Sequence, residues 1–430
     1  MQKGVKKQDK PAKIHKGIQR QESSAFKKTY NCSKRLNCEY KSIYLQKDKL
    51  SVMEITRFKA GKYNKQYGYS SFLPEPVNHE WLVSDAKVNR LLNEATRKLG
   101  ELNAFSKMIP DVDFFIRMHI TKEATRSSRI EGTQTSMEEA IQHAEYISPE
   151  KRDDWNEVQN YSEAMNFAIA QLEELPISTR LLKQTHAKLL QGVRGKNKLP
   201  GAFRTSQNWI GGATLNDAAY IPPHYSEVPE LMSDLEKLLN NEDLQVPSLI
   251  RIGIAHYQFE SIHPFLDGNG RLGRLLITLY LVSNKILGKP ALYLSDFFER
   301  NRSHYYDNLT AVRTQNNMAQ WLTFFLVGVL ETAENSILTF HEIIKLRSEL
   351  EEKRIITLGK KVPLAVQLIR YLYTKPVVNA SEVAKVLAVN ISTANRLIQD
   401  FEKLGILGEK TGFKRNRIFI FEKYLNLFER

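Results

Sequence analysis

From Trp81 onward, apolar residues recur every three or four positions, the spacing of one face of an α-helix. The first series, up to Pro110, is Val88, Leu91, Leu92, Ala95, Leu99 and Leu102, and a second helix continues through Met118 and Ala124. Similar periods predict helices at 137–147, 154–174, 179–191, 228–240, 248–261, 271–287, 303–315 and 319–350. The fold class is therefore expected to be mainly α.

One segment, residues 204–223, breaks the helical pattern. Its sequence Ile210-Gly211-Gly212-Ala213, followed by Tyr220-Ile221-Pro222-Pro223, predicts two short extended pieces around a turn. We expect a β-hairpin here within an otherwise helical body.

The C-terminal part has a different pattern. Helical periods near 364–372, 381–387 and 392–404 precede Gly405 and a strand-turn-strand that ends at Phe421. This order predicts a winged helix-turn-helix domain, with Ser392 or Thr393 capping the third helix. Its basic residues are expected on the third helix and the wing: Arg396, Lys403, Lys414, Arg415 and Arg417. Such domains bind DNA phosphates or serve in dimerisation and protein docking, so both kinds of partner stay open.

Four regions are predicted. Residues 1–52 carry 12 Lys and 2 Arg against 2 Asp and 2 Glu without an apolar period, so we expect a basic, disordered extension. Residues 53–175 form an N-terminal helical region, 176–350 a catalytic core and 351–430 the winged helix. Because composition changes at Met53, that residue is also a candidate translation start.

Charge and cysteines limit the possible environments. The formal net charge of +14 lies at the two ends of the chain and leaves the body near neutral, so it does not mark the body as a nucleic-acid binder. The two cysteines, Cys32 and Cys38, both lie in the N-terminal extension, which fits a reducing compartment. No signal-peptide core or apolar run near 20 residues occurs, so we expect a cytoplasmic protein.

Residues His263 to Arg274 bring a base, a carboxylate, a glycine loop and two guanidiniums together. Glycine backbones can turn N–H groups toward an anion, and a following helix adds its positive N-terminus. Asp267 is suited to hold a divalent cation, and Arg271 and Arg274 share one helix face. His263 can act as a base near neutral pH. The segment therefore predicts a polyphosphate site.

Other interpretations of this segment are weaker. Gly268 to Gly273 also fits the Gly-x-Gly-x-x-Gly dinucleotide fingerprint, but it lacks the strand that should lead into the first glycine. No P-loop motif occurs. A zinc site at His256, His263 and Asp267 lacks the usual cysteine or histidine pattern, so we expect His256 to be a helix residue with a local hydrogen bond.

The string His-Pro-Phe-Leu-Asp-Gly-Asn-Gly-Arg-Leu-Gly-Arg, residues 263–274, resembles the signature of Fic-domain proteins, His-x-Phe-x-(Asp/Glu)-Gly-Asn-Gly-Arg-x-x-Arg, at every specified position. The resemblance implies a Fic helical core with a β-hairpin flap. It also implies an Mg²⁺-dependent adenylyltransferase that moves AMP from ATP to a hydroxyl of a protein target.

The same resemblance assigns roles to the motif. It implies that His263 is the base, Asp267 the Mg²⁺ ligand, Asn269 with nearby backbone amides an anion hole, and Arg271 and Arg274 the phosphate contacts. The remaining residues of the expected ATP site are Gly268, Gly270, Leu272 and Gly273. Phe265 is interpreted as a core anchor.

The nucleotide site is expected to extend beyond the motif. By resemblance, Ile210, Gly211, Gly212 and Ala213 belong to the flap near the nucleotide, although an ordinary hairpin would use the same glycines. Tyr305 and Tyr306 are placed where family members line the adenine pocket, and Arg313 stands where relatives carry Asn. On a helix alone, two tyrosines are more typical of core.

An upstream motif concerns regulation. Ser127-Ser128-Arg129-Ile130-Glu131-Gly132 is similar to the Fic inhibitory pattern Ser/Thr-x-x-x-Glu-Gly/Asn. The resemblance implies that Glu131 pairs with Arg274, takes the place of the ATP γ-phosphate and inhibits the enzyme from within its own chain. Ser127 and Gly132 complete the inhibitory motif.

Several functional alternatives stay open. The same site could remove AMP from a modified target, or the Fic core could sense nucleotide for a DNA-binding regulator. The presence of both His263 and Asp267 favours catalysis. Target proteins are the expected partners, with DNA through the winged helix and a homodimer as further expectations.

Overall fold

The computed structural model describes residues 52–108, 111–192, 197–412 and 417–429, and the chain divides into residues 1–52 and 53–430. The predicted basic extension, with Cys32 and Cys38, lies outside the described residues apart from its last position. The wing residues Lys414 and Arg415 also lie outside them. The predicted boundaries at 175/176 and 350/351 stay predictions.

Four short strands precede the helices, which the helical pattern did not predict. β1 (Val52–Glu54) and β4 (Glu80–Leu82) form one two-stranded sheet, and β2 (Gly61–Lys65) pairs antiparallel with β3 (Ser70–Pro74). The expectation of a single hairpin at 204–223 was therefore wrong. Phe72 in β3 is buried against Tyr220, with ring centroids 6.1 Å apart, and its N–H donates to the Ile221 carbonyl. The β2–β3 hairpin thus packs against the predicted flap at 204–223.

The central helices are α2 (Ala86–Met108), α3 (Val112–Ile130), α5 (Arg152–Gln171), α6 (Thr179–Leu189), α7 (Val228–Asn240), α8 (Ser248–Ile262) and α9 (Asn269–Ser283). Every residue of α8 after Ser248 is buried, as are most of those in α9. These two helices form the centre of the core, and the loop between them carries the polyphosphate motif.

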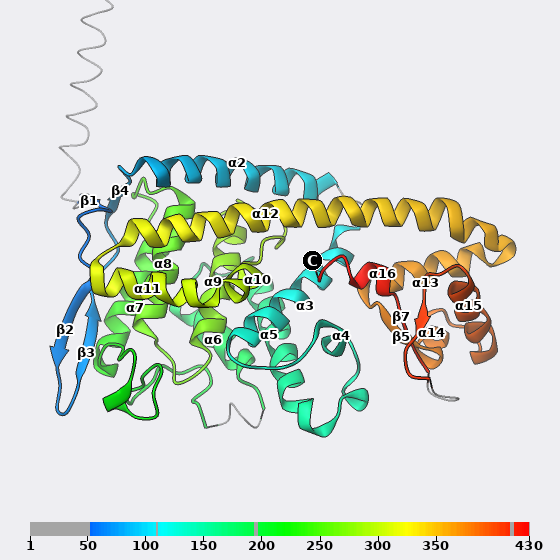
Figure 1. The fold of residues 1–430 in the computed structure, drawn as a ribbon, viewed down its shortest axis with the longest axis horizontal. Coiled ribbons are helices and arrows are strands. Elements are labelled where there is room, and N and C mark those ends of the chain that lie inside the picture. The colour runs from blue at the N-terminus through cyan, green and yellow to red at the C-terminus, as the bar shows by residue number, and fades with distance from the viewer. Residues whose placement is uncertain (1–51, 109–110, 193–196, 413–416, 430) are drawn as a thin grey trace, which may run out of the picture. The chain divides into compact units, whose positions relative to one another are not determined.

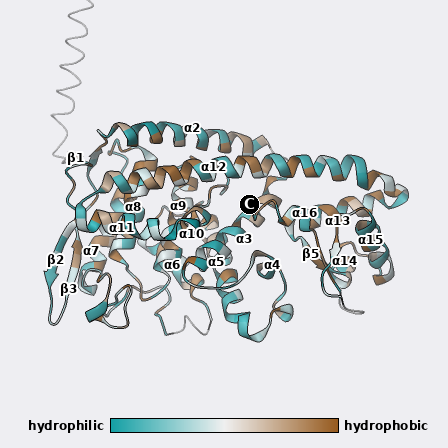
Figure 2. Ribbon diagram, viewed as in Figure 1, coloured by the Kyte–Doolittle hydropathy of each residue, from teal (hydrophilic) through white to brown (hydrophobic). Residues whose placement is uncertain are grey.

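α10 (Ser295–Arg300), α11 (Arg302–Gln315) and α12 (Met318–Ser348) follow, and α12 runs beside α2 (Figure 1). The stretch from Met318 to Thr374 is long and apolar enough to cross a membrane by length and composition alone. Figure 2 shows apolar residues along α12, and its side chains Trp321, Phe325 and Phe340 are buried. We interpret it as a core helix, because such helices pass the same criterion.

The C-terminal part begins after two irregular turns, η5 (Glu349–Arg354) and η6 (Ile355–Lys361). It contains α13 (Val362–Thr374), β5 (Val377–Asn379), α14 (Ala380–Val386), α15 (Ile391–Lys403), β6 (Gly408–Glu409), β7 (Ile418–Ile420) and α16 (Glu422–Leu425). The strands form an antiparallel sheet in the order β5-β7-β6. This element order is the one expected of a winged helix, and that assignment stays a prediction.

Two local predictions were wrong, and the predicted hairpin is shorter than expected. The side chain of Asn390, not Ser392 or Thr393, caps α15 by accepting from the Thr393 N–H at 2.8 Å. The helix predicted at 137–147 shortens to α4 (Met137–Ala140) with the single turns η1 (Ala144–Tyr146) and η2 (Pro149–Lys151) beyond it, and α10 was not predicted. The predicted hairpin at 204–223 has one bridge, between Ile210 and Tyr220, and the single turns η3 (Leu215–Asp217) and η4 (Tyr225–Glu227) lie within and after it.

Candidate functional site

The loop between α8 and α9 is fixed by one of its own side chains. His263 and Gly268, near its two ends, have left-handed backbone angles with φ of 50° and 76°. Asn269 Oδ1 accepts from the Phe265 N–H at 2.8 Å, and Asn269 Nδ2 donates to the Phe265 carbonyl at 2.9 Å. The Asn269 amide thus holds the loop, and its part in the anion hole that the resemblance implies stays a prediction. The N–H groups at the start of α9 are the better anion donors, because the first turn of a helix leaves them without intrahelical partners.

Two residues outside the motif hold the same loop. Arg204 is 2% exposed and donates from Nε to the His263 carbonyl at 3.0 Å. His186 Nε2 donates to the Asp267 carbonyl at 2.9 Å, since its Nδ1 accepts from the Gly201 N–H. The His186 ring also stacks on Phe265, with centroids 3.8 Å apart, and Phe265 is fully buried. These contacts set the direction of the His263 side chain.

His263 is unprotonated at neutral pH. Burial, together with the positive charge of Arg204, lowers the pKa of His263 to about 4. The imidazole is therefore neutral at pH 7, which is the form that a general base requires. Its Nδ1 is buried without a hydrogen-bond partner among the described residues, so its orientation depends on the loop.

Asp267 lies beside this base and reaches solvent. Its side chain is 46% exposed, and Oδ1 accepts from Arg271 Nη2 at 3.4 Å. A single carboxylate fits Mg²⁺ in a nucleotide site, because that ion usually takes one or two carboxylates, phosphate oxygens and water. Within the described ranges, no group of three or more His, Cys, Asp or Glu could hold a metal, so phosphate would have to complete the coordination.

The two arginines of the motif lie on one face of α9 and are almost completely buried. Arg271, 4% exposed, donates from Nη1 to Glu157 Oε2 at 3.0 Å. Arg274, 1% exposed, donates to the hydroxyl and the carbonyl of Ser127, both at 2.9 Å. Since both guanidiniums are fixed by neighbours, they present positive charge to a phosphate at little further entropic cost.

Glu131 forms the third contact of Arg274. Its Oε1 accepts from Arg274 Nη2 at 2.6 Å, which confirms the pairing that the inhibitory pattern implies. Burial opposes ionisation of this carboxyl, but the charge of Arg274 outweighs it and keeps the pKa of Glu131 below its usual value. The ion pair also raises the pKa of Arg274 despite its burial. Glu131 is therefore an anion at neutral pH.

Glu131 also lies against the first turn of α9. A Cβ placed on Gly270 would come within 2.3 Å of Glu131 Oε1 and 2.9 Å of Arg274 Nη1. The absence of a side chain at Gly270 thus leaves room for an oxygen between the helix N-terminus and the guanidinium. This is the position in which an anionic oxygen is most stabilised.

The predicted flap residues lie in a tight turn. Gly211 and Gly212 have positive φ of 70° and 74°, and a Cβ on Gly212 would meet the Asp217 carbonyl oxygen at 2.4 Å. The Asp217 carboxylate accepts from the N–H groups of Ala213 and Thr214. Both glycines are therefore required by the turn, and their contact with nucleotide stays a prediction.

The predicted adenine residues occupy different environments. Tyr305 is 1% exposed, and its hydroxyl donates to His256 Nε2 at 2.9 Å, because His256 Nδ1 donates to the Gly273 carbonyl. Tyr306 is 38% exposed and is the member of the pair that reaches the surface. The bonds of His256 are long-range rather than local as expected, since they connect α8 to α9 and α11.

Arg313 and a glutamate that sequence reasoning missed complete the surroundings. The Arg313 guanidinium lies 4.0 Å from the ring centroid of Tyr220, so it packs on the flap. Glu260 is 8% exposed, its Oε1 lies 2.2 Å from a Cβ placed on Gly273, and burial raises its pKa to about 7. A carboxylate inside an otherwise apolar helix was the available signal for Glu260, whereas no pattern distinguishes Arg204, His186 or Glu157.

Two parts of the chain match models of known protein families. Residues 89–170 match the Fic/DOC family N-terminal domain, and residues 176–281 match the Fic/DOC family domain. Protein adenylyltransferase Fic of Drosophila grimshawi is 32% identical over 158 residues, 36% of this chain and 29% of that protein. The Drosophila erecta protein of the same name is 30% identical over 156 residues, 36% of this chain and 28% of that protein.

The chain therefore spans less than a third of the length of these curated relatives. A crystal structure of a Fic family protein from Desulfovibrio desulfuricans G20 has a TM-score of 0.50 and 18% identity. It covers 79% of this chain and 97% of that protein's chain. The match shows a shared fold, so the predicted helical core is confirmed.

Proposed function

We propose that this Fic-domain protein, which contains both domains of the Fic/DOC family, is a protein adenylyltransferase. It would transfer AMP from ATP to a Ser, Thr or Tyr hydroxyl of a target protein or of itself. The observation that carries the proposal is one loop, in which neutral His263 ends α8 and the following helix, α9, carries the buried guanidinium of Arg274 with its partner Glu131.

The chemistry follows from these positions. The target hydroxyl oxygen attacks the α-phosphorus of ATP, a new P–O bond forms, and the bond from the α-phosphorus to the bridging oxygen breaks. Pyrophosphate leaves, and the hydroxyl proton moves to the imidazole of His263. The α9 N–H groups, Arg271 and Arg274 stabilise negative charge on the phosphates, which is the main contribution of protein groups to such transfers.

A magnesium ion fits the carboxylate of Asp267, as the resemblance implies. When bound, it would neutralise phosphate charge and help to orient the phosphate chain. The side chain of Asp267 supplies the protein ligand, and its hydrogen bond from Arg271 places that carboxylate beside the phosphate-binding arginines.

Glu131 would inhibit the reaction in the arrangement described above. Its carboxylate neutralises Arg274 and occupies space above Gly270. The γ-phosphate of ATP would therefore lack Arg274 as a partner and would be repelled by the negative charge of Glu131. ATP would then bind with its α-phosphorus badly aligned for attack. The family resemblance alone also allows the reverse reaction, AMP removal, at this site.

The test is incubation of Glu131→Gly protein with Mg²⁺, a cell lysate and ATP labelled at either the α- or the γ-phosphate. Protein-bound α-label without γ-label, lost in Glu131→Gly/His263→Ala, is the expected result. Protein-bound γ-label that depends on His263 would replace AMP transfer by phosphate transfer. No label that depends on His263 would contradict the proposal, and release of AMP from a pre-labelled target would then favour AMP removal.

We further propose, from the sequence, that the protein works in the cytoplasm, and, from the family resemblance, that it forms a homodimer; DNA contacts would run through the predicted winged helix. The near-neutral charge of the body leaves the two basic ends as the regions for any nucleic-acid contact.

A further inference from the structure

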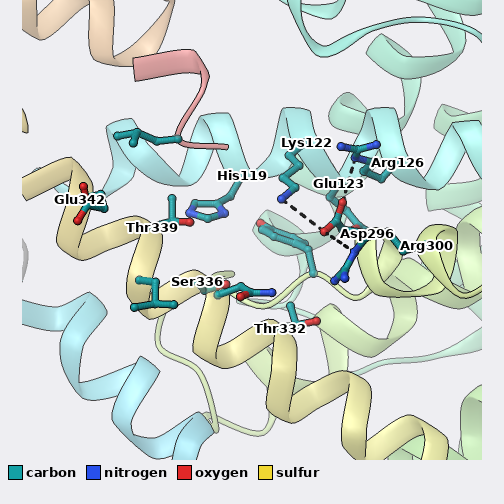
Figure 3. A pocket seen from close by; sticks show the side chains of 14 residues that line it. His119, Lys122, Glu123, Arg126, Asp296, Arg300, Thr332, Ser336, Thr339 and Glu342 are labelled. Carbon is teal, nitrogen blue, oxygen red and sulfur yellow. Dashed lines mark ion pairs between the residues drawn. The ribbon is translucent and has the colours of Figure 1, made fainter. Parts of the chain in front are cut away.

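A separate cavity lies along α3, beside His119, Lys122, Glu123 and Arg126. It has a volume of about 160 Å³ and is enclosed by α3, α10, α12 and the C-terminal Leu427 (Figure 3). None of the residues of the proposed AMP-transfer site lines it. The cavity therefore needs an explanation apart from ATP.

One end of this cavity gathers positive charge around a single carboxylate. Asp296 accepts ion pairs from Arg126 Nε at 3.0 Å, Arg300 Nε at 3.4 Å and Lys122 Nζ at 3.6 Å. Arg126 also pairs with Glu299 at 3.2 Å. Three cations thus face two carboxylates. Burial lowers the pKa of Lys122, the charge of Asp296 opposes this, and the charge of Arg126 lowers the pKa further.

The other carboxylates of the lining do not neutralise this end. Glu123 points to other partners, because its oxygens accept from the Tyr161 hydroxyl and from the hydroxyl and N–H of Ser295. Glu342 lies across the cavity, on the far side of His119 from Asp296 (Figure 3). An added anion beside Arg126 would therefore meet net positive charge.

The rest of the wall offers hydrogen-bonding groups. Four polar residues of α12 line the cavity at the spacing of one helix face: Thr332, Asn335, Ser336 and Thr339. His119, 6% exposed, contributes an Nε2 without a hydrogen-bond partner among the described residues. Burial lowers its pKa to about 3, so the ring is neutral, and a buried polar atom of this kind favours a polar occupant.

A neighbouring hollow enlarges the basic end. It has a volume of about 230 Å³, shares Lys122 and Arg126 with the first cavity and adds Arg129, with Glu429 as its one carboxylate among the described residues. These three residues lie on one face of α3, which ends in the Glu131 cap. The basic stripe therefore belongs to the same helix as the carboxylate that pairs with Arg274.

We propose that this cavity binds a small organic phosphate, with its phosphate at Arg126, Lys122 and Arg300 and its hydroxyl groups along α12. Guanidinium groups suit phosphate oxygens, because they donate two parallel hydrogen bonds. A cavity of 160 Å³ is close to the roughly 150 Å³ that holds a benzene-sized molecule, so the occupant is smaller than a nucleotide.

The test is calorimetric titration of the full chain with glycerol 3-phosphate, inorganic phosphate and glycerol. We expect glycerol 3-phosphate to bind with a Kd below about 1 mM, inorganic phosphate to bind more weakly and glycerol not to bind. Arg126→Gln should raise the Kd for glycerol 3-phosphate at least about tenfold, which is about 1.4 kcal/mol. Arg117→Gln, an exposed arginine of the same helix outside this cavity, is the matched control and should have no effect.

Arg300→Gln keeps the test decisive if Arg126→Gln does not fold. The side chain of Arg300 is 49% exposed, so the fold depends little on it. The variant should still raise the Kd for glycerol 3-phosphate severalfold. Thr339→Val removes a hydroxyl at nearly constant size. It should weaken the binding of glycerol 3-phosphate, so that its Kd comes closer to that of inorganic phosphate. No measurable binding, or binding that Arg126→Gln and Arg300→Gln leave unchanged, would overturn the proposal.

Discussion

Glu131 differs from a surface ion-pair residue, because its partner Arg274 has a side chain only 1% exposed. A buried guanidinium requires a counter-charge, and Glu131 supplies it. Under the proposed function, Glu131 and a phosphate of ATP would compete for Arg274. Charge and size of residue 131 should then affect inhibition separately.

The charge can be tested by Glu131→Gln, which keeps the size of the side chain. We expect AMP transfer by this variant to lie between that of the wild type and that of Glu131→Gly, because the neutral amide no longer repels phosphate but still fills space above Gly270. Initial rates with α-labelled ATP measure this, and Glu163→Gln, an exposed carboxylate on α5, is the control. Equal rates for Glu131→Gln and wild type would show that charge does not inhibit.

The pH dependence tests His263. Its pKa is lowered to about 4, so the imidazole stays in the base form until the pH falls well below the ordinary value of about 6.5. For Glu131→Gly, kcat/KM for AMP transfer should therefore stay nearly constant from pH 8 down to pH 5. A fall with a midpoint near pH 6.5 would contradict the buried environment of this base.

Glu260 should affect stability rather than chemistry. Burial raises its pKa from the model-compound value of 4.5 to about 7, so the folded state holds a proton that the unfolded state releases. Its contribution is most favourable below pH 4.5 and is lost as pH rises through 7, by up to roughly 3 kcal/mol. Glu260→Gln should make the free energy of unfolding, measured by urea titration, change less with pH between pH 5 and 8. An unchanged slope, relative to wild type, would sink this assignment.

At the residue scale, the sequence predicted the motif loop and the Glu131–Arg274 pair. It did not predict Arg204 or His186, because a residue that fixes a loop from a distant segment leaves no local pattern. Nor did it predict that the Asn269 amide closes the loop. The role of a side chain depends on which residues it contacts in the fold, and the spacing of residues along the sequence does not reveal those contacts.

At the scale of elements, α3 connects the inhibitory residue to the C-terminal part. Its Phe115 is buried against Tyr373 of α13 and Tyr424 of α16, with ring centroids 5.8 and 6.3 Å apart. His119 packs on Phe428, with centroids 5.1 Å apart. The helix that ends at Glu131 is thus held along its N-terminal half by the C-terminal elements.

Phe115→Ala tests this support. The loss of a fully buried ring should lower the free energy of unfolding by about 3–5 kcal/mol, and the loosened helix should raise AMP transfer. Phe114→Ala, which changes a partly buried neighbour on another helix face, should cost less. If urea unfolding gave equal losses for the two variants, the account of α3 packing would be wrong.

Helix periodicity located the long elements well, since α7 begins and ends where it was predicted. Short elements were missed where packing, not pattern, stabilises them. The β2–β3 hairpin depends on Phe72 against Tyr220, residues far apart in sequence. Around 137–147, a capping box at Ser136 and Glu139 starts a helix that ends after one turn.

At the scale of the whole molecule, both proposed sites involve α3. The proposed ATP site lies at its C-terminal end, and the basic cavity lies along the face that contains Lys122 and Arg126. The family comparisons cover residues 89–281 and do not reach the α12 wall or the C-terminal part of the cavity. The proposed phosphate site therefore rests on this chain's own geometry.

The most direct test of the central claim is the initial rate of protein-bound α-label for wild type, Glu131→Gly and Glu131→Gly/His263→Ala under identical Mg²⁺ and ATP. The account predicts a gain of at least about tenfold for Glu131→Gly, about 1.4 kcal/mol of barrier, and a loss of about 10²–10⁴-fold when His263 is also removed. Equal rates for wild type and Glu131→Gly would contradict inhibition by Glu131, and a double variant as active as Glu131→Gly would contradict His263 as the base.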